Sequence, residues 1–314
     1  MNHAEPNTGD GAGGLPLSVG VRALMWPVVL ALLPALAVQA WFFGAGVLGN
    51  VLVAVCAGWL LEAFVLKVRR HRWRVASTDG SVVITGLLIA LAVPPDMPVW
   101  QFVLGLAFAV LVAKHCYGGV GRNIFNPAMV GYAFLIVSFP ASLTAWPLAS
   151  SMVDATTAAT PLTALRSEGS AYILRSAWAE DRAFLSINAA YLAGGMILLW
   201  MRACTLDLPV AFIVGLLLAS SLTYATGAGD WTPWLHLTTG ASLCAAFFIV
   251  TDPVTAPNLP VARLAFGVLT GALIVAIREF GDFPDGVAFA VLFANAAGPA
   301  LDEVERRIHA RGGA

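Results

Sequence analysis

The feature that most constrains this chain is a succession of long apolar segments separated by short polar intervals. Hydrophobic residues make up 59% of its 314 residues and charged residues only 11%, whereas a soluble domain carries roughly 25% charged residues. A helix of ~20 apolar residues can cross the ~30 Å hydrocarbon core of a bilayer. The pattern therefore predicts an integral membrane protein of the all-α class. The widely spaced cysteines form no CxxC pair, so we predict neither a disulfide nor a metal site.

Ten of the apolar segments have spanning character. Six are close to the length of a full crossing, and the third, fifth, eighth and tenth are shorter, with about 12 to 15 residues each. The short segments are bounded by Gly, Pro or Asp, which is typical of helices that break inside a membrane. The ten segments are 24–43, 47–66, 82–93, 99–115, 128–139, 183–201, 208–225, 237–250, 261–278 and 287–301.

The segments fall into two sets of five with a common order of features. Each set has a Thr-Gly pair at a short apolar run, Thr85-Gly86 and Thr239-Gly240, followed by a proline turn and a longer helix. A final short helix opens at Asn126 in the first set and at Asp285 in the second. An odd number of helices per set inverts the second repeat, and interrupted helices point to a site where such repeats meet. The predicted fold is ten transmembrane helices in two inverted five-helix repeats with short broken helices.

The positive charges predict the orientation of this arrangement. The chain divides into a disordered tail, 1–20; a first repeat, 21–139; a loop, 140–181; a second repeat, 182–303; and a tail, 304–314. With ten spans, thirteen of the seventeen Lys and Arg residues fall on one side and four on the other. Because positive charge marks the cytoplasmic side, both tails are predicted to be cytoplasmic and the loop periplasmic. The four exceptions are Arg166, Arg175, Arg182 and Arg278.

The longest polar interval contains the stretch Asp154–Thr163, which is rich in Thr and Ala. Pro161 favours an extended backbone at the residue before it, so we expect Thr160 to project its hydroxyl from an extended segment. The small Ala158 and Ala159 leave space beside it. Two interpretations stay open. One is a Thr-rich turn whose aspartate caps a short helix, and the other is a covalent attachment point at Thr160.

The segment between the fourth and fifth apolar runs combines glycines, basic residues and a helix start. The glycines allow tight turns or a close approach to a ligand, and they are Gly118, Gly119 and Gly121. Asn126-Pro127 opens the next helix. Its free amides, with Lys114 and Arg122 nearby, could hold an anion or the polar edge of a ring. The alternative is a hairpin connection with a basic rim.

Three acidic residues interrupt the apolar pattern. Asp252 and Asp285 lie at the broken ends of short helices in equivalent halves. An ionisable residue there marks either an ion site or a helix cap. Glu62 lies near the end of the second segment, close to Lys67, where snorkelling or pairing is expected rather than catalysis.

Four stretches taken together resemble one membrane-protein family. Gly118–Tyr132, Asp154–Thr163, Phe248–Thr255 and Phe283–Ala290 look like the motifs of the D-type membrane protein of the Rnf ion-translocating oxidoreductase. The B-type protein of the sodium-pumping NADH:quinone reductase has a segment similar to the first of them. The resemblance covers most of residues 80–300 and implies ten helices in two inverted halves.

The resemblance also implies a cofactor. In that family a Thr in a (Ser/Thr)-Gly-Ala-Thr motif carries FMN through a phosphoester bond, which a dedicated flavin transferase makes. The matching residues are Thr157, Ala158, Ala159 and Thr160, so Thr160 would carry the FMN, and Ala158 stands where the family usually has Gly. A second, non-covalent riboflavin in the bundle is also implied. The candidate cofactor-binding residues are Asp154, Thr157, Ala158, Ala159, Thr160, Pro161, Gly118, Gly119, Gly121 and Asn126.

The implied function is that of one subunit, not catalytic alone, in an Rnf complex of the bacterial inner membrane. The complex would couple electron transfer between ferredoxin and NAD to movement of Na⁺ or H⁺, with the A-, B-, C-, E- and G-type proteins of that complex as partners. No nucleic-acid partner is expected. Two other classes stay open: a small-solute transporter or channel, because inverted repeats also build transporters, and a structural membrane scaffold. A bound flavin would separate the electron-transfer class from the transporter class.

Overall fold

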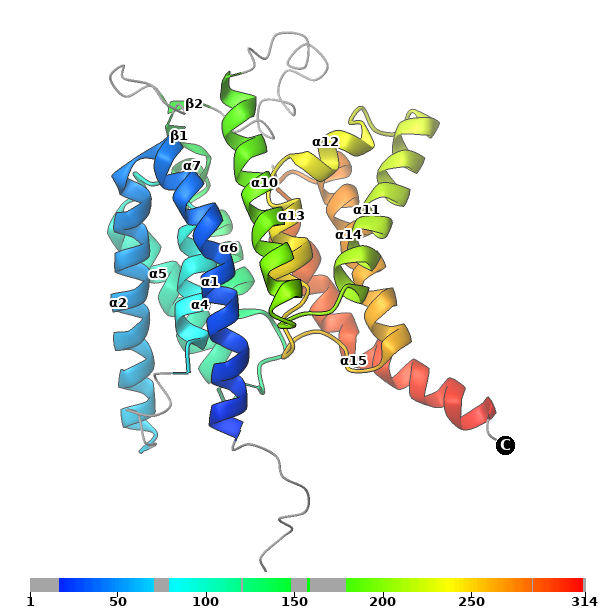
Figure 1. The fold of residues 1–314 in the computed structure, drawn as a ribbon, viewed down its shortest axis with the longest axis horizontal. Coiled ribbons are helices and arrows are strands. Elements are labelled where there is room, and N and C mark those ends of the chain that lie inside the picture. Colours follow the sequence, from blue (N-terminus) through cyan, green and yellow to red (C-terminus); the bar gives the residue numbers. More distant parts are fainter. Residues whose placement is uncertain are drawn as a thin grey trace, which may run out of the picture.

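The computed structural model describes residues 17–70, 79–119, 121–147, 157–158, 179–283 and 285–312. Within them the chain is a bundle of helices with one short pair of strands (Figure 1). The first half contains α1 (Leu17–Phe43), α2 (Ala45–Val68), α4 (Ser81–Ala90), α5 (Val99–Ala107), the π-helix η1 (Phe108–His115), α6 (Pro127–Ser138) and α7 (Pro140–Thr144). After strands β1 (Trp146–Pro147) and β2 (Thr157–Ala158) come α10 (Ala179–Trp200), α11 (Asp207–Thr226), α12 (Pro233–Thr238), α13 (Ser242–Cys244), the π-helix η2 (Ala245–Ile249), α14 (Pro260–Phe280) and α15 (Val287–Gly312).

Six helices in the described part of the chain are long and apolar enough to cross a membrane, so this is a multi-pass membrane protein. They are Leu24–Phe43, Ala45–Val68, Arg182–Trp200, Asp207–Thr226, Pro260–Phe280 and Val287–Arg311. Shorter apolar helices lie among them, at Ser81–Ala90, Val99–His115 and Pro127–Ser138. The predicted all-helical membrane fold is confirmed, with β1 and β2 as a two-stranded addition. Helix α1 begins at Leu17, inside the predicted tail 1–20 and before the apolar span that starts at Leu24.

The tenth predicted segment is longer than its apolar pattern indicates. Helix α15 has 26 residues and continues through the predicted tail 304–314 as far as Gly312. In this extension Glu303 pairs with Arg306 and Arg307 within about one helical turn. Opposite charges three and four residues apart stabilise a helix. The helix therefore does not end where the hydropathy falls.

The predicted match between Thr85-Gly86 and Thr239-Gly240 is wrong. The first pair lies inside α4, whereas the second lies in the break between α12 and α13. The comparable helix starts are Ser81 and Ser242. Ser81 directly follows Gly80, and Ser242 lies two residues after Gly240; both glycines have positive φ, 88° and 61°. Glycine adopts this conformation without the strain that a side chain would add.

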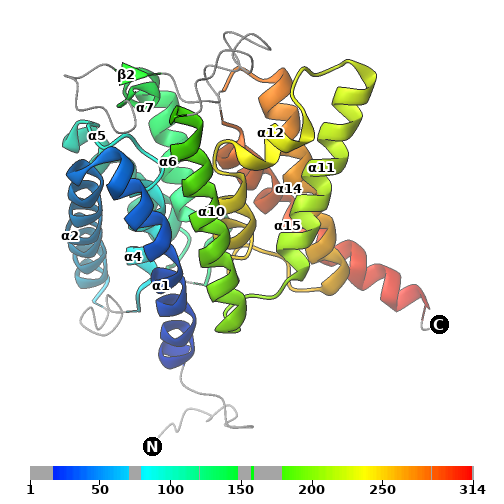
Figure 2. The ribbon, with the colours of Figure 1, turned by 45° about the horizontal axis from the view of Figure 1, so that its top comes forward.

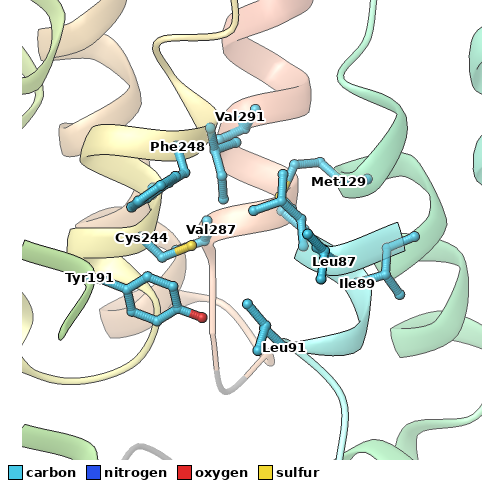
Figure 3. Packing of buried hydrophobic residues seen from close by; sticks show 14 of the residues in the cluster. Leu87, Ile89, Leu91, Met129, Tyr191, Cys244, Phe248, Val287 and Val291 are labelled. Carbon is cyan, nitrogen blue, oxygen red and sulfur yellow. The ribbon is translucent and has the colours of Figure 1, made fainter. Parts of the chain in front are cut away.

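The two halves of the chain pack against each other along α1 and α10, which lie side by side in both views of the bundle (Figures 1 and 2). A Cβ at Gly194 of α10 would lie only 2.1 Å from the carbonyl oxygen of Ala31 in α1, so the absence of a side chain permits this close approach. Figure 3 shows Leu87 of α4 facing Phe248 of η2 and Val291 of α15 across the interior, and all three belong to one cluster of buried hydrophobic residues. The apolar core therefore joins the two halves.

The bundle has two chemically different ends. Strands β1 and β2 lie at one of them, which we name the strand end (Figure 1). They pair antiparallel, with Trp146 opposite Ala158 and Pro147 opposite Thr157. Helix α2 ends at the other, which we name the basic end after the Lys and Arg residues that lie at the helix ends there. In the described residues these include Lys67, Arg69, Arg70, Lys114, Arg122, Arg202 and Arg263.

Candidate functional site

Two cavities lie between the halves of the chain, one toward each end of the bundle. The strand-end cavity has a volume of about 430 Å³ and is lined from α1, α6, β1, α10, α13 and α15. The basic-end cavity has a volume of about 90 Å³ and is lined from α1, α4, η1, α6 and the turn after η2. Leu88 of α4 lines both, while Phe248 and Ile249 of η2 line one cavity each. A thin apolar partition therefore separates the two cavities.

Aromatic rings make up much of the wall of the strand-end cavity. Trp146 packs edge-on against Phe43, with 5.2 Å between the ring centroids. The amide of Gln39 donates from Nε2 to the carbonyl oxygen of Leu91 (3.1 Å) and to the hydroxyl of Tyr191 (3.3 Å). A wall of rings with a few placed polar groups suits a flat ligand with a polar edge. The aromatic residues of the wall are Tyr132, Trp146, Phe184, Tyr191 and Phe283.

The Thr-rich stretch meets this cavity through the strand pair. Trp146 of β1 lines the cavity and is also the residue opposite Ala158 of β2. The backbone of Thr157 and Ala158 therefore runs beside the strand that forms part of the cavity wall. The other predicted site residues of the stretch lie outside the described residues, and they are Asp154, Ala159, Thr160 and Pro161.

Asp285 holds a helix start at the strand-end cavity. Its Oδ1 accepts from the amide of Val287 (3.3 Å) and from Nη2 of Arg278 (3.1 Å), and its Oδ2 accepts from the amide of Ala241 (3.2 Å). Asp285 therefore links the first turn of α15 to the break before α13. Arg278 is only 1% exposed and has three further acceptors, which are the carbonyl oxygens of His236 and Thr239 and the hydroxyl of Ser242.

Asn126 and Asp252 come together at the basic-end cavity. The Asn126 side chain accepts from the amides of Ala128 (3.0 Å) and Met129 (3.3 Å), which is the N-cap role at α6. Its Nδ2 donates to Oδ2 of Asp252 (3.2 Å), and its backbone amide donates to Oδ1 of Asn295 (3.0 Å). Asn126 thus ties the start of α6 to the turn after η2 and to α15.

Asp252 lies in the turn after η2, beyond the spanning helices, and faces the basic-end cavity. Its carboxylate accepts from the amide of Val254 (3.0 Å) and the hydroxyl of Thr255 (3.3 Å) in addition to Asn126. Burial raises the pKa of the Asp252 carboxyl above its usual range, although these three hydrogen bonds act in the opposite direction. The raised pKa eases proton binding at this position.

The glycine-rich turn has the predicted backbone but lies away from the cavities. The φ angles of Gly118, Gly119 and Gly121 are 113°, 101° and 84°. These values lie in the region that favours glycine. None of the three lines either cavity described above. The structure therefore brings Asn126 and Asp252 together but places the glycines and Asp285 elsewhere.

The sequence did not identify Lys114 as the partner of Glu62. Glu62 is 1% exposed and accepts from Nζ of Lys114 at 2.5 Å, so it pairs, which is one of the two outcomes expected for it, with a partner that the sequence did not identify. Lys114 is 2% exposed and also donates to the hydroxyl of Ser81 (2.7 Å). Glu62 and Lys114 have opposite charges, and each is an isolated charge near the basic end of its own apolar segment. This pattern in the sequence could have identified the pair.

Comparison with known proteins places the chain in a family. The sequence profile of the NQR2, RnfD, RnfE family matches residues 17–310. Among curated relatives, the D-type protein of the ion-translocating oxidoreductase complex from Aeromonas hydrophila subsp. hydrophila is 39% identical, over 91% of this chain and 93% of the relative. The corresponding protein of Aeromonas salmonicida gives the same values. That of Escherichia coli strain SE11 is 39% identical over 90% of this chain and 92% of the relative.

Proposed function

Because the chain belongs to the NQR2, RnfD, RnfE family, we propose that it is the D-type membrane component of an ion-translocating oxidoreductase complex. The complex couples electron transfer between ferredoxin and NAD to the movement of Na⁺ or H⁺. The chain acts with partner proteins of the A, B, C, E and G types and is not catalytic alone. A dedicated flavin transferase loads it with FMN at Thr160.

The observation that supports the cofactor best is the strand-end cavity beside β1 and β2. Its volume of about 430 Å³ falls in the range of ~300–1,000 Å³ that is usual for small-molecule sites. Thr160 follows Ala158 by two positions, and two residues of extended chain span at most about 7 Å. A flavin phosphate on Thr160 is therefore within reach of a cavity whose wall includes Trp146, the partner of Ala158.

The residues of this cavity suit an isoalloxazine ring. Tyr132, Trp146 and Phe184 offer flat apolar faces, and the hydroxyl of Tyr191 with the amide of Gln39 offers a polar edge. When bound, FMN supplies one- and two-electron transfer, and the chain supplies its placement and its shielding from water. The basic-end cavity, at about 90 Å³, is too small for riboflavin in this structure.

The proposed topology is ten crossings in two inverted five-helix repeats, with both termini in the cytoplasm of a bacterial cell. The six long helices, the three shorter apolar ones and the broken run α12–α13–η2 supply the crossings. Corresponding side chains support the repeat: Lys114 donates to Ser81 in the first half, and Arg278 donates to Ser242 in the second. The basic end would then be cytoplasmic.

This topology limits what the flavin can do alone. An FMN at the strand end would lie on the far side of the membrane from ferredoxin and NAD. Electrons would have to cross a ~30 Å apolar core, so partner proteins or another cofactor must carry the intermediate steps. Asp252 and Asp285, one toward each cavity, remain our candidates for the path of the coupling ion.

The test is intact mass and in-gel flavin fluorescence of the chain purified from its native host. We expect one FMN of added mass and fluorescence that survives denaturation, both absent from Thr160→Ala. The matched control is Thr163→Ala, three residues further on in the same stretch, which should keep both signals. Covalent flavin that persists in Thr160→Ala would overturn the assignment, and a flavin-free wild-type chain would favour the transporter or scaffold class.

A further inference from the structure

A cluster of charged side chains lies buried beside the basic-end cavity, and the proposed function does not use it. Glu62 of α2 and Lys114 of η1 form its centre, as described above. The hydroxyl of Ser81, which accepts from Lys114, donates in turn to Oδ1 of Asp79 at 2.6 Å. Lys114 and Ser81 also line the cavity. The cluster therefore connects a buried ion pair to an internal space at the basic end.

His115, the last residue of η1, completes this cluster. It is 4% exposed, and its Nε2 lies 3.7 Å from Oε1 of Glu62, within ion-pair range but beyond a hydrogen bond. Among the described residues, neither ring nitrogen of His115 has a hydrogen-bond partner, and Oε2 of Glu62 also has none. A neutral imidazole carries one free lone pair. The cluster thus holds unused acceptor positions on two buried groups.

Stability does not explain this arrangement. A buried polar group without a partner costs about 1–3 kcal/mol, and a buried ion pair is often no better for stability than apolar residues of the same size. An ionisable group inside a membrane protein is therefore a candidate for function. In this cluster the free acceptors of Glu62 and His115 are the feature that a function would use.

The glycine-rich turn follows His115 directly and reaches the surface at the basic end. A Cβ at Gly119 would lie 3.9 Å from Nδ1 of His115, so the buried Gly119 packs beside the ring at ordinary contact distance. The neighbouring Cys116, Tyr117 and Gly118 are exposed at the basic end. The buried ring therefore lies within three residues of exposed positions of the chain.

The ligands around the imidazole favour a proton over a metal cation. Lys114 and Arg69, whose guanidinium donates to the carbonyl oxygen of His115 at 2.7 Å, place positive charge beside the ring, and Glu62 is the carboxylate that offsets it. A hard cation also needs several oxygen ligands. The described residues contain no group of three or more His, Cys, Asp or Glu side chains able to hold a metal ion. A proton needs only one lone pair.

We propose that His115 and Glu62 form a proton-exchange site that opens to the basic end of the bundle, with Lys114 as its resident counter-charge. A proton from the medium adds to the free lone pair of His115, and the resulting imidazolium is stabilised by the carboxylate of Glu62. The proton returns by the same route or passes to Oε2 of Glu62. The facing charges are Glu62 and Lys114, with Arg69 at the end of α2 and Asp79 behind Ser81.

The second half of the chain contains a natural control. Nε2 of His236 lies 2.9 Å from Oε1 of Glu279, so this histidine–glutamate pair is already hydrogen-bonded. It lies near the break between α12 and α13, on different helices from the first pair. A change at Glu279 should leave His115 untouched.

The experiment is ¹⁵N NMR of the full-length chain, with labelled histidine, in lipid nanodiscs. The chain has five histidines, and His115→Gln identifies the signal. We expect the ¹⁵N signal of His115 to change with pH, as it must if the ring takes up a proton on its free lone pair. In Glu62→Gln this change should be displaced toward lower pH, because an opposite charge within ion-pair range favours the charged ring.

Two further variants make the result decisive. Lys114→Met should displace the pH-dependent change of the His115 signal toward higher pH, and Glu279→Gln should leave it in place. If Glu62→Gln fails to fold, Glu62→Gln with Lys114→Gln removes both charges and keeps the measurement possible. A His115 signal that stays in one protonation state, or that Glu279→Gln shifts as much as Glu62→Gln does, would overturn the proposal. No flavin is involved, so the outcome is independent of the proposed function.

Discussion

Replacing Arg278 by Met should destabilise the protein strongly, because it removes the buried cation that joins α14 to the α12–α13 break and to α15. Its four hydrogen bonds would sum to about 6–12 kcal/mol if each were worth the ~1.5–3 kcal/mol typical of charged groups. That sum overstates the loss, because two of the acceptors keep another donor: Ser242 still donates to the carbonyl oxygens of His236 and Thr239. Asp285 also keeps two amide donors. We therefore expect a loss of about 3–5 kcal/mol, as for one partner of a buried pair.

The measurement is the free energy of unfolding from SDS titration in mixed micelles. The control is Arg263→Met, which breaks a similar Arg–Asp pair whose side chains are 24% and 31% exposed, and its loss should cost less because water screens a partly exposed pair. Arg278→Met with Asp285→Asn should recover part of the loss, because it also removes the unpaired carboxylate. An Arg278→Met protein no less stable than the Arg263→Met protein would refute the reasoning.

Two further outcomes are expected. Because burial raises the pKa of Asp252 above its unfolded value, its neutral form stabilises the fold at low pH, and this contribution is lost as the pH rises through the raised pKa. Asp252→Asn should therefore lose less thermal stability than wild type as the pH rises above about 4, where an ordinary Asp carboxyl ionises. In vesicles of the whole complex it should lower ion-coupled turnover while Thr160 keeps its flavin, and unchanged stability and turnover would argue against both roles. In a cysteine-free background, an impermeant thiol reagent added to intact cells should label Ser170→Cys but not Arg70→Cys, and the reverse labelling would invert the proposed orientation.

Local patterns in the sequence correctly predicted the long helices, one helix cap and one turn, because neighbouring residues determine these features. The long apolar helices follow directly from hydropathy. Asn126 was correctly placed at a helix start, since an Asn-Pro pair combines a capping side chain with a residue suited to the first turn. The predicted glycine turn also has the positive φ angles that only glycine adopts easily.

The contacts that build the candidate sites could not be read in this way. Glu62 and Lys114 are 52 residues apart, and Asn126 and Asp252 are 126 residues apart. Each pair depends on how distant helices pack, and no short pattern reports it. The wrong match of Thr85-Gly86 with Thr239-Gly240 has a similar cause. The same dipeptide lies inside a helix in one half and in a break between helices in the other, and its sequence does not distinguish the two.

The way in which α15 holds α14 has a consequence for how the chain is made. Asp302 accepts from the amides of Asn258 and Leu259, and Glu305 accepts from the amide of Ala262 at 2.6 Å. These amides open α14, yet their acceptors lie 43 to 44 residues further along the chain. During synthesis α14 leaves the ribosome before its acceptors do, so its start cannot be completed until that part of α15 has been made. Protein quality control would therefore meet an unfinished helix in any chain that stops short of Asp302.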